Sequence, residues 1–136
     1  MDASTPQATS ITHVALSVRD LDHSIAWYSE LWSQPPVHVG TMLAGTEHEH
    51  RVAVWAEPAL GLHCFDEQVD GPFSPRRAGL DHLAFGCSSR DELERWADHL
   101  DGMHARRGQI LDEPYGSGLA FWDPDGIALE FYVSAF

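Results

Sequence analysis

Four side chains that could bind a metal or move a proton stand at matched positions of the chain. His82 follows His13 by 69 residues, and Glu130 follows His63 by 67 residues. Imidazole nitrogen and carboxylate oxygen are familiar ligands of borderline divalent metals. An unpaired carboxylate within an apolar strand is costly, and a bound cation removes that cost. We therefore predict a metal site formed by His13, His82 and Glu130.

The spacing reflects an internal repeat that covers most of the chain. Residues 12–31 align with residues 81–100, and residues 52–65 align with residues 119–132. Two long matches at nearly equal offsets indicate a duplicated supersecondary unit.

Each repeat predicts a strand, a helix and three further strands. Asp20 is a predicted helix N-cap, and a capping box at 89–92 opens the second helix. This order predicts an α+β fold of two tandem βαβββ modules. The predicted strands are 11–18, 37–43, 51–56, 60–65, 80–87, 104–111, 118–122 and 127–133. The predicted organisation is a disordered tail (1–10), a first module (11–69), a linker (70–78) and a second module (79–136).

Strand alternation places the candidate ligands on one face of each sheet. Successive side chains of a strand point to opposite faces. His13 therefore shares a face with Ala15, opposite Leu16, and Glu130 shares a face with Tyr132. The small neighbours on this face leave room for a bound molecule, and the apolar face is suited to packing under a helix. Cys64 and Cys87 are predicted to lie on the helix side as core thiols, and the chain lacks a CxxC spacing.

Composition restricts the classes of partner. The formal net charge is −13, from 21 acidic and 8 basic residues, and every basic residue is arginine. This charge argues against binding to nucleic acid or to anionic membranes. The chain shows no apolar run long enough to span a membrane and no signal peptide, so a cytoplasmic protein is expected.

Several residues allow two interpretations. His13 and His82, each taken alone, could be hydrogen-bonded histidines without a metal. Trp122, like its repeat partner Trp55, could line a cavity or fill the core. Tyr132 could donate a hydrogen bond to a substrate or lie at a cavity rim. The run 48–50, His-Glu-His, is predicted to be a solvated turn.

Three motifs resemble the vicinal-oxygen-chelate superfamily, which includes glyoxalase I, extradiol dioxygenases, fosfomycin-resistance transferases and bleomycin-binding proteins. They are Thr-His-Val-Ala-Leu-Ser-Val (12–18), Gly-Leu-Asp-His-Leu-Ala-Phe (79–85) and Asp-Pro-Asp-Gly-Ile-Ala-Leu-Glu-Phe-Tyr (123–132). The resemblance implies a U-shaped, partly open barrel around the metal site. It also implies the same ligand set, His13, His82 and Glu130.

The resemblance further implies an enzyme that acts on a small substrate chelating the metal through adjacent oxygens. His63 stands where glyoxalase I has a glutamate, which favours a dioxygenase-like reaction with Fe(II), although Zn, Ni, Mn or Co could bind. Extradiol dioxygenases usually carry a histidine and a tyrosine upstream of the turn at 123–126, but residues 113–120 contain no histidine, and the tyrosine is displaced to Tyr115. A glyoxalase-like isomerase or lyase and a metal-free binding protein remain the alternatives.

Roles follow for individual residues under this resemblance. His63 is expected to be the acid–base group or a fourth metal ligand, and Tyr132 is a second catalytic candidate. Tyr115, Trp122 and Arg51 are candidates for binding the substrate. Family members pair their modules within one chain or between two chains, and a homodimer is expected here.

Overall fold

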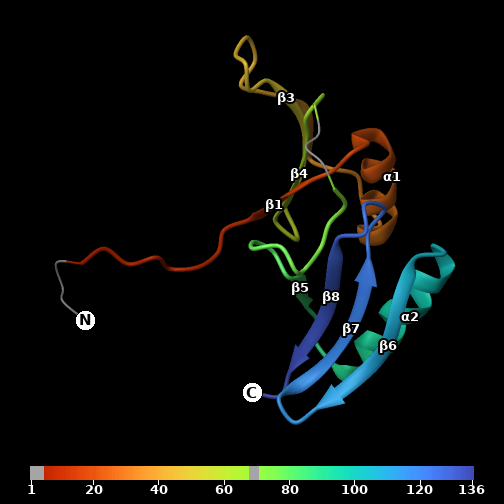
Figure 1. Ribbon diagram of the computed structural model, residues 1–136. Helices are drawn as coiled ribbons and strands as arrows, with labels where there is room; N and C mark the ends of the chain where they lie inside the picture. The colour runs from red at the N-terminus through yellow and green to blue at the C-terminus, as the bar shows by residue number, and fades with distance from the viewer. Residues whose placement is uncertain (1–4, 68–70) are drawn as a thin grey trace.

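The computed structural model of the chain describes residues 5–67 and 71–136 (Figure 1). The described residues form two helices and eight strands. The order strand, helix, strand, strand, strand occurs twice, which confirms the α+β class and both βαβββ modules. The predicted boundary at 69/70 and the first part of the predicted tail lie outside the described residues. The first module contains β1 (Val14–Ser17), α1 (Leu21–Trp32), β2 (His38–Met42), β3 (His50–Trp55) and β4 (Leu60–Cys64). The second contains β5 (Leu83–Gly86), α2 (Arg90–Gly102), β6 (Arg106–Glu113), β7 (Gly116–Trp122) and β8 (Ala128–Ser134).

Each module forms its own four-stranded sheet. The strand orders are β1-β4-β3-β2 in sheet A and β5-β8-β7-β6 in sheet B. In each sheet the first strand runs parallel to the last, and the remaining pairs are antiparallel. Within the described ranges no strand pair joins the two sheets, so one chain does not close a barrel. β1 and β5 therefore each have a free edge.

The predicted caps explain where the helices begin. The side chain of Asp20 accepts a hydrogen bond from the backbone N–H of His23, and that of Ser89 accepts one from Glu92. Both bonds satisfy donors that lack a partner in the first turn of a helix. Neither helix in the described part of the chain is long and apolar enough to cross a membrane.

The first strand of each module is shorter than predicted. β1 begins at Val14 rather than at residue 11, and β5 begins at Leu83 rather than at residue 80. β1 pairs only with β4, which begins at Leu60, and β5 pairs only with β8. Among the described residues, no strand pairing includes residues 11–13 or 80–82. His13 and His82 therefore lie directly before their strands, not inside them.

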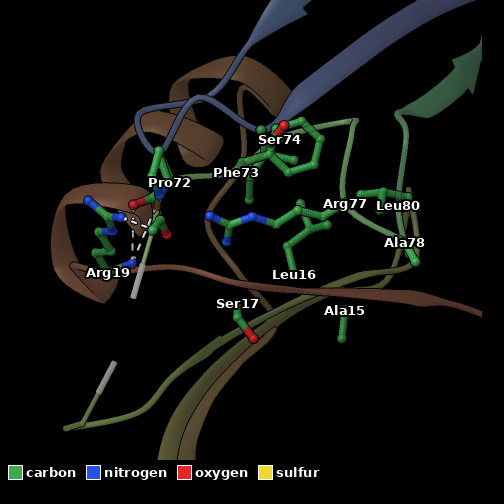
Figure 2. A pocket seen from close by; sticks show the side chains of 13 residues that line it. Ala15, Leu16, Ser17, Arg19, Pro72, Phe73, Ser74, Arg77, Ala78 and Leu80 are labelled. Carbon is green, nitrogen blue, oxygen red and sulfur yellow. Dashed lines mark hydrogen bonds between the residues drawn. The ribbon is translucent and has the colours of Figure 1, made fainter. Parts of the chain in front are cut away.

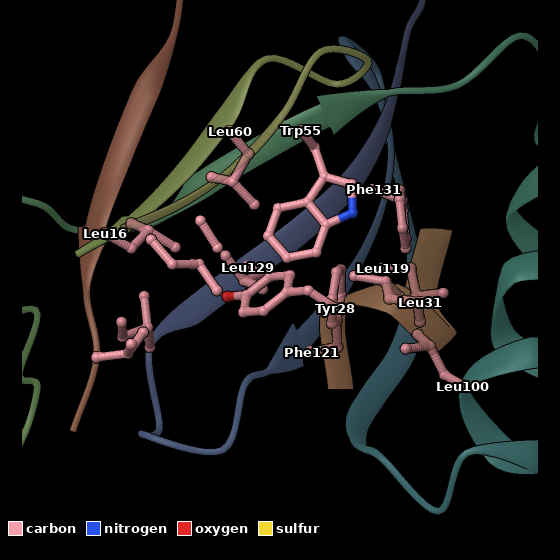
Figure 3. Packing of buried hydrophobic residues seen from close by; sticks show 14 of the residues in the cluster. Leu16, Tyr28, Leu31, Trp55, Leu60, Leu100, Leu119, Phe121, Leu129 and Phe131 are labelled. Carbon is pink, nitrogen blue, oxygen red and sulfur yellow. The ribbon is translucent and has the colours of Figure 1, made fainter. Parts of the chain in front are cut away.

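One hydrophobic core serves both modules (Figure 3). Helix α1 contacts both sheets, since Tyr28 lies against Trp55 of sheet A while Trp27 stacks on Phe121 of sheet B, with ring centroids 6.1 Å and 6.3 Å apart. The apolar faces of both sheets pack against this shared core, as strand alternation predicts. The opposite, polar face of each sheet is turned away from the core.

A buried hydrogen bond links the two modules through this core. The Tyr28 hydroxyl donates to Oδ2 of Asp123 at 2.8 Å, and both side chains are buried. Oδ1 of Asp123 accepts from the backbone N–H groups of Asp125 and Ile127. Burial is the main cause that raises the pKa of Asp123, and these hydrogen bonds oppose the rise. The Tyr28 hydroxyl therefore stabilises a carboxylate in the interior.

We expect Tyr28→Phe to lower the free energy of unfolding by about 1–3 kcal/mol, because a buried acceptor loses its donor. Urea unfolding at neutral pH measures this loss, and Tyr115→Phe, which changes an exposed residue, serves as the control. The difference in unfolding free energy between Tyr28→Phe and the wild type should shrink as the pH falls, because a protonated, uncharged Asp123 gains less from the hydroxyl donor. A deficit equal to that of the control would contradict a stabilising role for this bond.

Candidate metal centre

The polar face of sheet B brings His82 and Glu130 together. Nε2 of His82 lies 3.8 Å from Oε1 of Glu130, and the Glu130 side chain is 25% exposed. Nδ1 of His82 lies 2.7 Å from the Asp81 carboxylate. A carboxylate only accepts, so Nδ1 carries a proton, and in the neutral ring Nε2 presents its lone pair. Two electron-rich atoms thus face one point, where a cation would relieve their repulsion.

Small residues surround this carboxylate. Glu130 pairs with Ala84 on one side and with Ala120 on the other. A Cβ atom added at Gly118 would lie 2.9 Å from Oε2 of Glu130. Glycine at this position therefore gives the carboxylate its space beside the neighbouring strand.

We expect Gly118→Ala to weaken metal binding by about 10-fold, near the lower end of the effect of altering groups around a ligand. The added methyl group would displace the carboxylate while leaving the fold intact, because a flexible side-chain end can move. Gly108→Ala is a matched control, since its added Cβ would make only ordinary contacts with Ala120. Titration with Zn(II) compares the variants. Equal affinities in both would show that the space at Gly118 does not set the carboxylate position.

The polar face of sheet A carries His63, with His13 near it at the start of β1. Nδ1 of His13 lies 2.9 Å from the Thr12 hydroxyl, the counterpart of the contact between Asp81 and His82. Burial is the main cause that lowers the pKa of His63, and the nearby rings of His50 and His13 lower it further. The lowered pKa favours the neutral form of His63, in which one ring nitrogen can bind a proton or a metal.

His50 belongs to this group, and the prediction of a solvated turn is wrong for it. The His48 side chain is 71% exposed, as predicted, but His50 is 7% exposed and begins β3. Its Nε2 lies 2.7 Å from Nδ1 of His63. Strand alternation is the signal in the sequence, because it places His50 and Val52 on the same face of β3. Val52 pairs with His63, but this register of β3 against β4 is known only from the folded structure.

Two of the remaining candidate site residues, Trp122 and Tyr132, lie on the polar face of sheet B. Trp122 pairs with Ala128 on the polar face, and the Arg106 guanidinium lies 4.3 Å from the centre of its ring. Tyr132 also lies on this face, where its hydroxyl donates to the backbone oxygen of Tyr115. Tyr115 is 57% exposed in the turn between β6 and β7.

Arg51 lies on the other face. It pairs across the sheet with Cys64 rather than with His63, and its guanidinium forms an ion pair of 3.0 Å with Asp22 of α1. Its side chain therefore turns toward the helix and away from the polar face that carries His63. Both cysteines pack against the core on this side, as predicted.

Cavities border the free edges of β1 and β5. Figure 2 shows Leu16 on one side of β1, next to Arg77, and Ala15 and Ser17 on the other side, around a cavity of about 370 Å³. A second cavity of about 280 Å³ lies between residues 11–14 and residues 83–85. Across residues 5–67 and 71–136, however, no three His, Cys, Asp or Glu side chains are grouped so as to hold a metal. The chain thus presents two incomplete clusters, His82 with Glu130 and His13 with His63.

Comparisons with known proteins agree with this architecture. A family model described as Glyoxalase/Bleomycin resistance protein/Dioxygenase superfamily matches residues 10–131. The chain is 27% identical over 124 residues to the uncharacterized protein YaeR of Escherichia coli (strain K12), covering 90% of this chain and 94% of that protein.

Solved structures show the same fold. A glyoxylase/bleomycin resistance protein/dioxygenase domain from Frankia sp. EAN1pec is 30% identical, with a TM-score of 0.76, and covers 94% of this chain and 93% of that one. A mutant of the fosfomycin resistance protein FosX from Listeria monocytogenes is 14% identical, with a TM-score of 0.65 and 93% coverage of both chains. That FosX structure is a complex with Mn(II) and 1S,2S-dihydroxypropylphosphonic acid.

Proposed function

The chain belongs to the glyoxalase/bleomycin resistance protein/dioxygenase superfamily, and on that basis we propose that it is a metal-dependent enzyme of the vicinal-oxygen-chelate type. Its ligands are His13, His82 and Glu130. The observation that carries the proposal is the approach of Nε2 of His82 to the Glu130 carboxylate, at 3.8 Å. Metal–ligand bonds of about 2.1 Å would place the two atoms roughly 3.0–3.4 Å apart, for angles of about 90–109° at the metal. The donor set therefore fits a divalent ion after a small closure.

A second copy of the chain completes the site in this proposal. The free edges of β1 and β5 offer unpaired backbone groups, which are templates for pairing with another strand. Apolar residues lie exposed beside them, with Ile11 at 85% and Leu80 at 38%. A twofold dimer would place β1 of one copy beside β5 of the other. His13 and His63 of one copy would then face His82 and Glu130 of the other across one cavity.

We propose ferrous iron as the metal and a dioxygenase-like reaction as the chemistry. Two histidines and one carboxylate leave open positions, and when bound, Fe(II) in such a set would bind adjacent substrate oxygens and support dioxygen chemistry. In support of a chelating substrate, FosX of the same fold is complexed with Mn(II) and a ligand with hydroxyls on adjacent carbons.

The chain's own residues have distinct tasks around such a substrate. His63, neutral and on the polar face, accepts the proton of a substrate hydroxyl. The flat ring of Trp122 offers a stacking surface, with Arg106 beside it as a cation. Tyr132 lies on the same face as Glu130, and its hydroxyl is held by a hydrogen bond to the Tyr115 backbone oxygen. These groups favour a small polar substrate with an aromatic or anionic end.

Metal analysis of protein purified without oxygen tests the proposal. We expect one divalent ion per chain, and oxygen uptake with some members of a panel of catechols and other compounds with adjacent oxygens. Uptake should disappear with a chelator and return with Fe(II). Turnover with a redox-inert ion in the absence of oxygen would instead indicate a glyoxalase-like isomerase or lyase. Tight ligand binding that is unaffected by chelator, with no product, would overturn the enzyme in favour of a binding protein.

A further inference from the structure

A continuous chain of hydrogen bonds connects the backbone to His63. Nδ1 of His50 lies 2.7 Å from the backbone oxygen of His48, and Nε2 of His50 lies 2.7 Å from Nδ1 of His63. His50 is 7% exposed. The buried His50 thus engages Nδ1 of His63, and Nε2 is the second ring nitrogen of His63.

The chemistry of the partners determines where the protons lie. A carbonyl oxygen only accepts, so Nδ1 of His50 donates to His48. A neutral imidazole has one proton, so Nε2 of His50 must accept the hydrogen bond that Nδ1 of His63 donates. The neutral His63 ring then has its lone pair on Nε2. This nitrogen lies 3.7 Å from the position that a Cβ atom on Gly61 would take, on the same polar face as Ala15.

We propose that His50 is a positioning residue, which holds His63 in the tautomer that presents its Nε2 lone pair on the polar face of sheet A. This inference rests on the proposed function of His63 as the group that accepts a substrate proton or binds the metal. His50 does for His63 what Asp81 does for His82, since each engages Nδ1 and leaves Nε2 bare. Without such a partner, a neutral histidine generally prefers its proton on Nε2, which would block both roles.

The surroundings hold His50 in place. The turn before β3 is closed by backbone bonds from Thr46 to Leu43 and from Glu49 to Thr46, so the His48 oxygen has a defined position. Phe65 stacks on the His50 ring, with centroids 4.0 Å apart and an interplanar angle of 23°. Ring packing and hydrogen bonding can therefore be removed separately by substitution.

Nitrogen-15 NMR of the histidine side chains in the metal-free protein reports the tautomer directly. His63 is assigned as the signal absent from His63→Gln. In the wild type we expect Nδ1 of His63 to be protonated. His50→Phe keeps the ring stack and removes the acceptor, so most of His63 should move to the Nε2-protonated form. His50→Gln loses the ring but offers an amide oxygen near the former Nε2, and it should restore the Nδ1-protonated form.

Phe65→Leu is the packing control, and it should leave the tautomer of His63 unchanged. Backbone amide spectra establish that each variant is folded. If His50→Phe does not fold, His50→Asn replaces it, because its shorter side chain also removes the acceptor from His63. An unchanged Nδ1-protonated His63 in His50→Phe would overturn the inference, as would an Nε2-protonated His63 in the wild type. The tautomer is measured without metal or substrate. The result therefore does not depend on whether the proposed enzyme function is correct, and the test of that function does not depend on the tautomer.

Discussion

Replacing Glu130 by alanine should lower the affinity for a divalent metal by more than about 100-fold, beyond the usual effect of altering a group outside the ligand set. The carboxylate supplies the only negative charge among the three proposed ligands, and it faces the bare Nε2 of His82. Glu130→Gln keeps the shape and removes the charge, so it should lose nearly as much affinity. Metal titration followed by elemental analysis of the dialysed protein measures both effects.

A matched control separates metal binding from the overall charge. Glu47→Ala removes one acid whose side chain is 86% exposed, and it should leave metal affinity unchanged. If Glu130 only formed a charge pair with His82, the Glu130→Ala protein would lose stability and retain its metal. Full metal occupancy in that protein would contradict its assignment as a ligand.

Replacing His63 by alanine should lower the turnover rate by about 10²–10⁴, the usual effect of losing a positioned proton-transfer group. Burial and the neighbouring His50 and His13 lower the pKa of His63, so the ring can accept a proton near neutral pH. Because His13, His82 and Glu130 form the proposed ligand set, metal content should survive in His63→Ala. Steady-state rates and metal content, measured on the same preparation, test both statements.

His48→Ala is the control for this prediction, because His48 is an exposed histidine of the same module, in the turn before β3. Metal affinity reduced in His63→Ala as strongly as in His13→Ala would make His63 a fourth ligand instead. Normal metal content together with near-normal turnover would exclude both roles and leave His63 as a residue that only lines the cavity.

Most of the fold could be predicted because two periodic signals agree. The repeat relates His13 to His82 and so defines two modules, while strand alternation separates Leu16 from Ala15 and Leu129 from Glu130. Both depend on local geometry. The strand beginnings could not be predicted, because β1 and β5 begin only where the neighbouring strand offers a backbone partner.

The relative placement of the modules depends on contacts that alternation does not encode. Tyr28 of α1 lies against Trp55 of its own module, but the adjacent Trp27 stacks on Phe121 of the other module. Trp32 likewise contacts Phe85 and Phe131. These contacts join the apolar faces of both sheets in one core. They also explain why the predicted ligands appear as two incomplete clusters within one chain.

The candidate site was therefore only partly visible in the sequence. The pairing of His82 with Glu130 on one polar face follows from alternation and is seen in the structure. The contact of His50 with His63 required the register of β3 against β4, which places Val52 opposite His63. A side chain that points toward solvent in an isolated turn is buried once that register forms.

Subunit mixing tests the central claim, a metal site shared between two copies of the chain. His13→Ala and Glu130→Ala proteins should each bind metal weakly. After joint unfolding and refolding, about half of the dimers should be mixed, and each should have one intact site of two. High-affinity sites should thus return to about one quarter of the wild-type number. Mixing His82→Ala with Glu130→Ala should restore none, because both changes damage the same cluster. A mixture of His13→Ala and Glu130→Ala with no recovered sites, although mixed dimers form, would contradict the shared site.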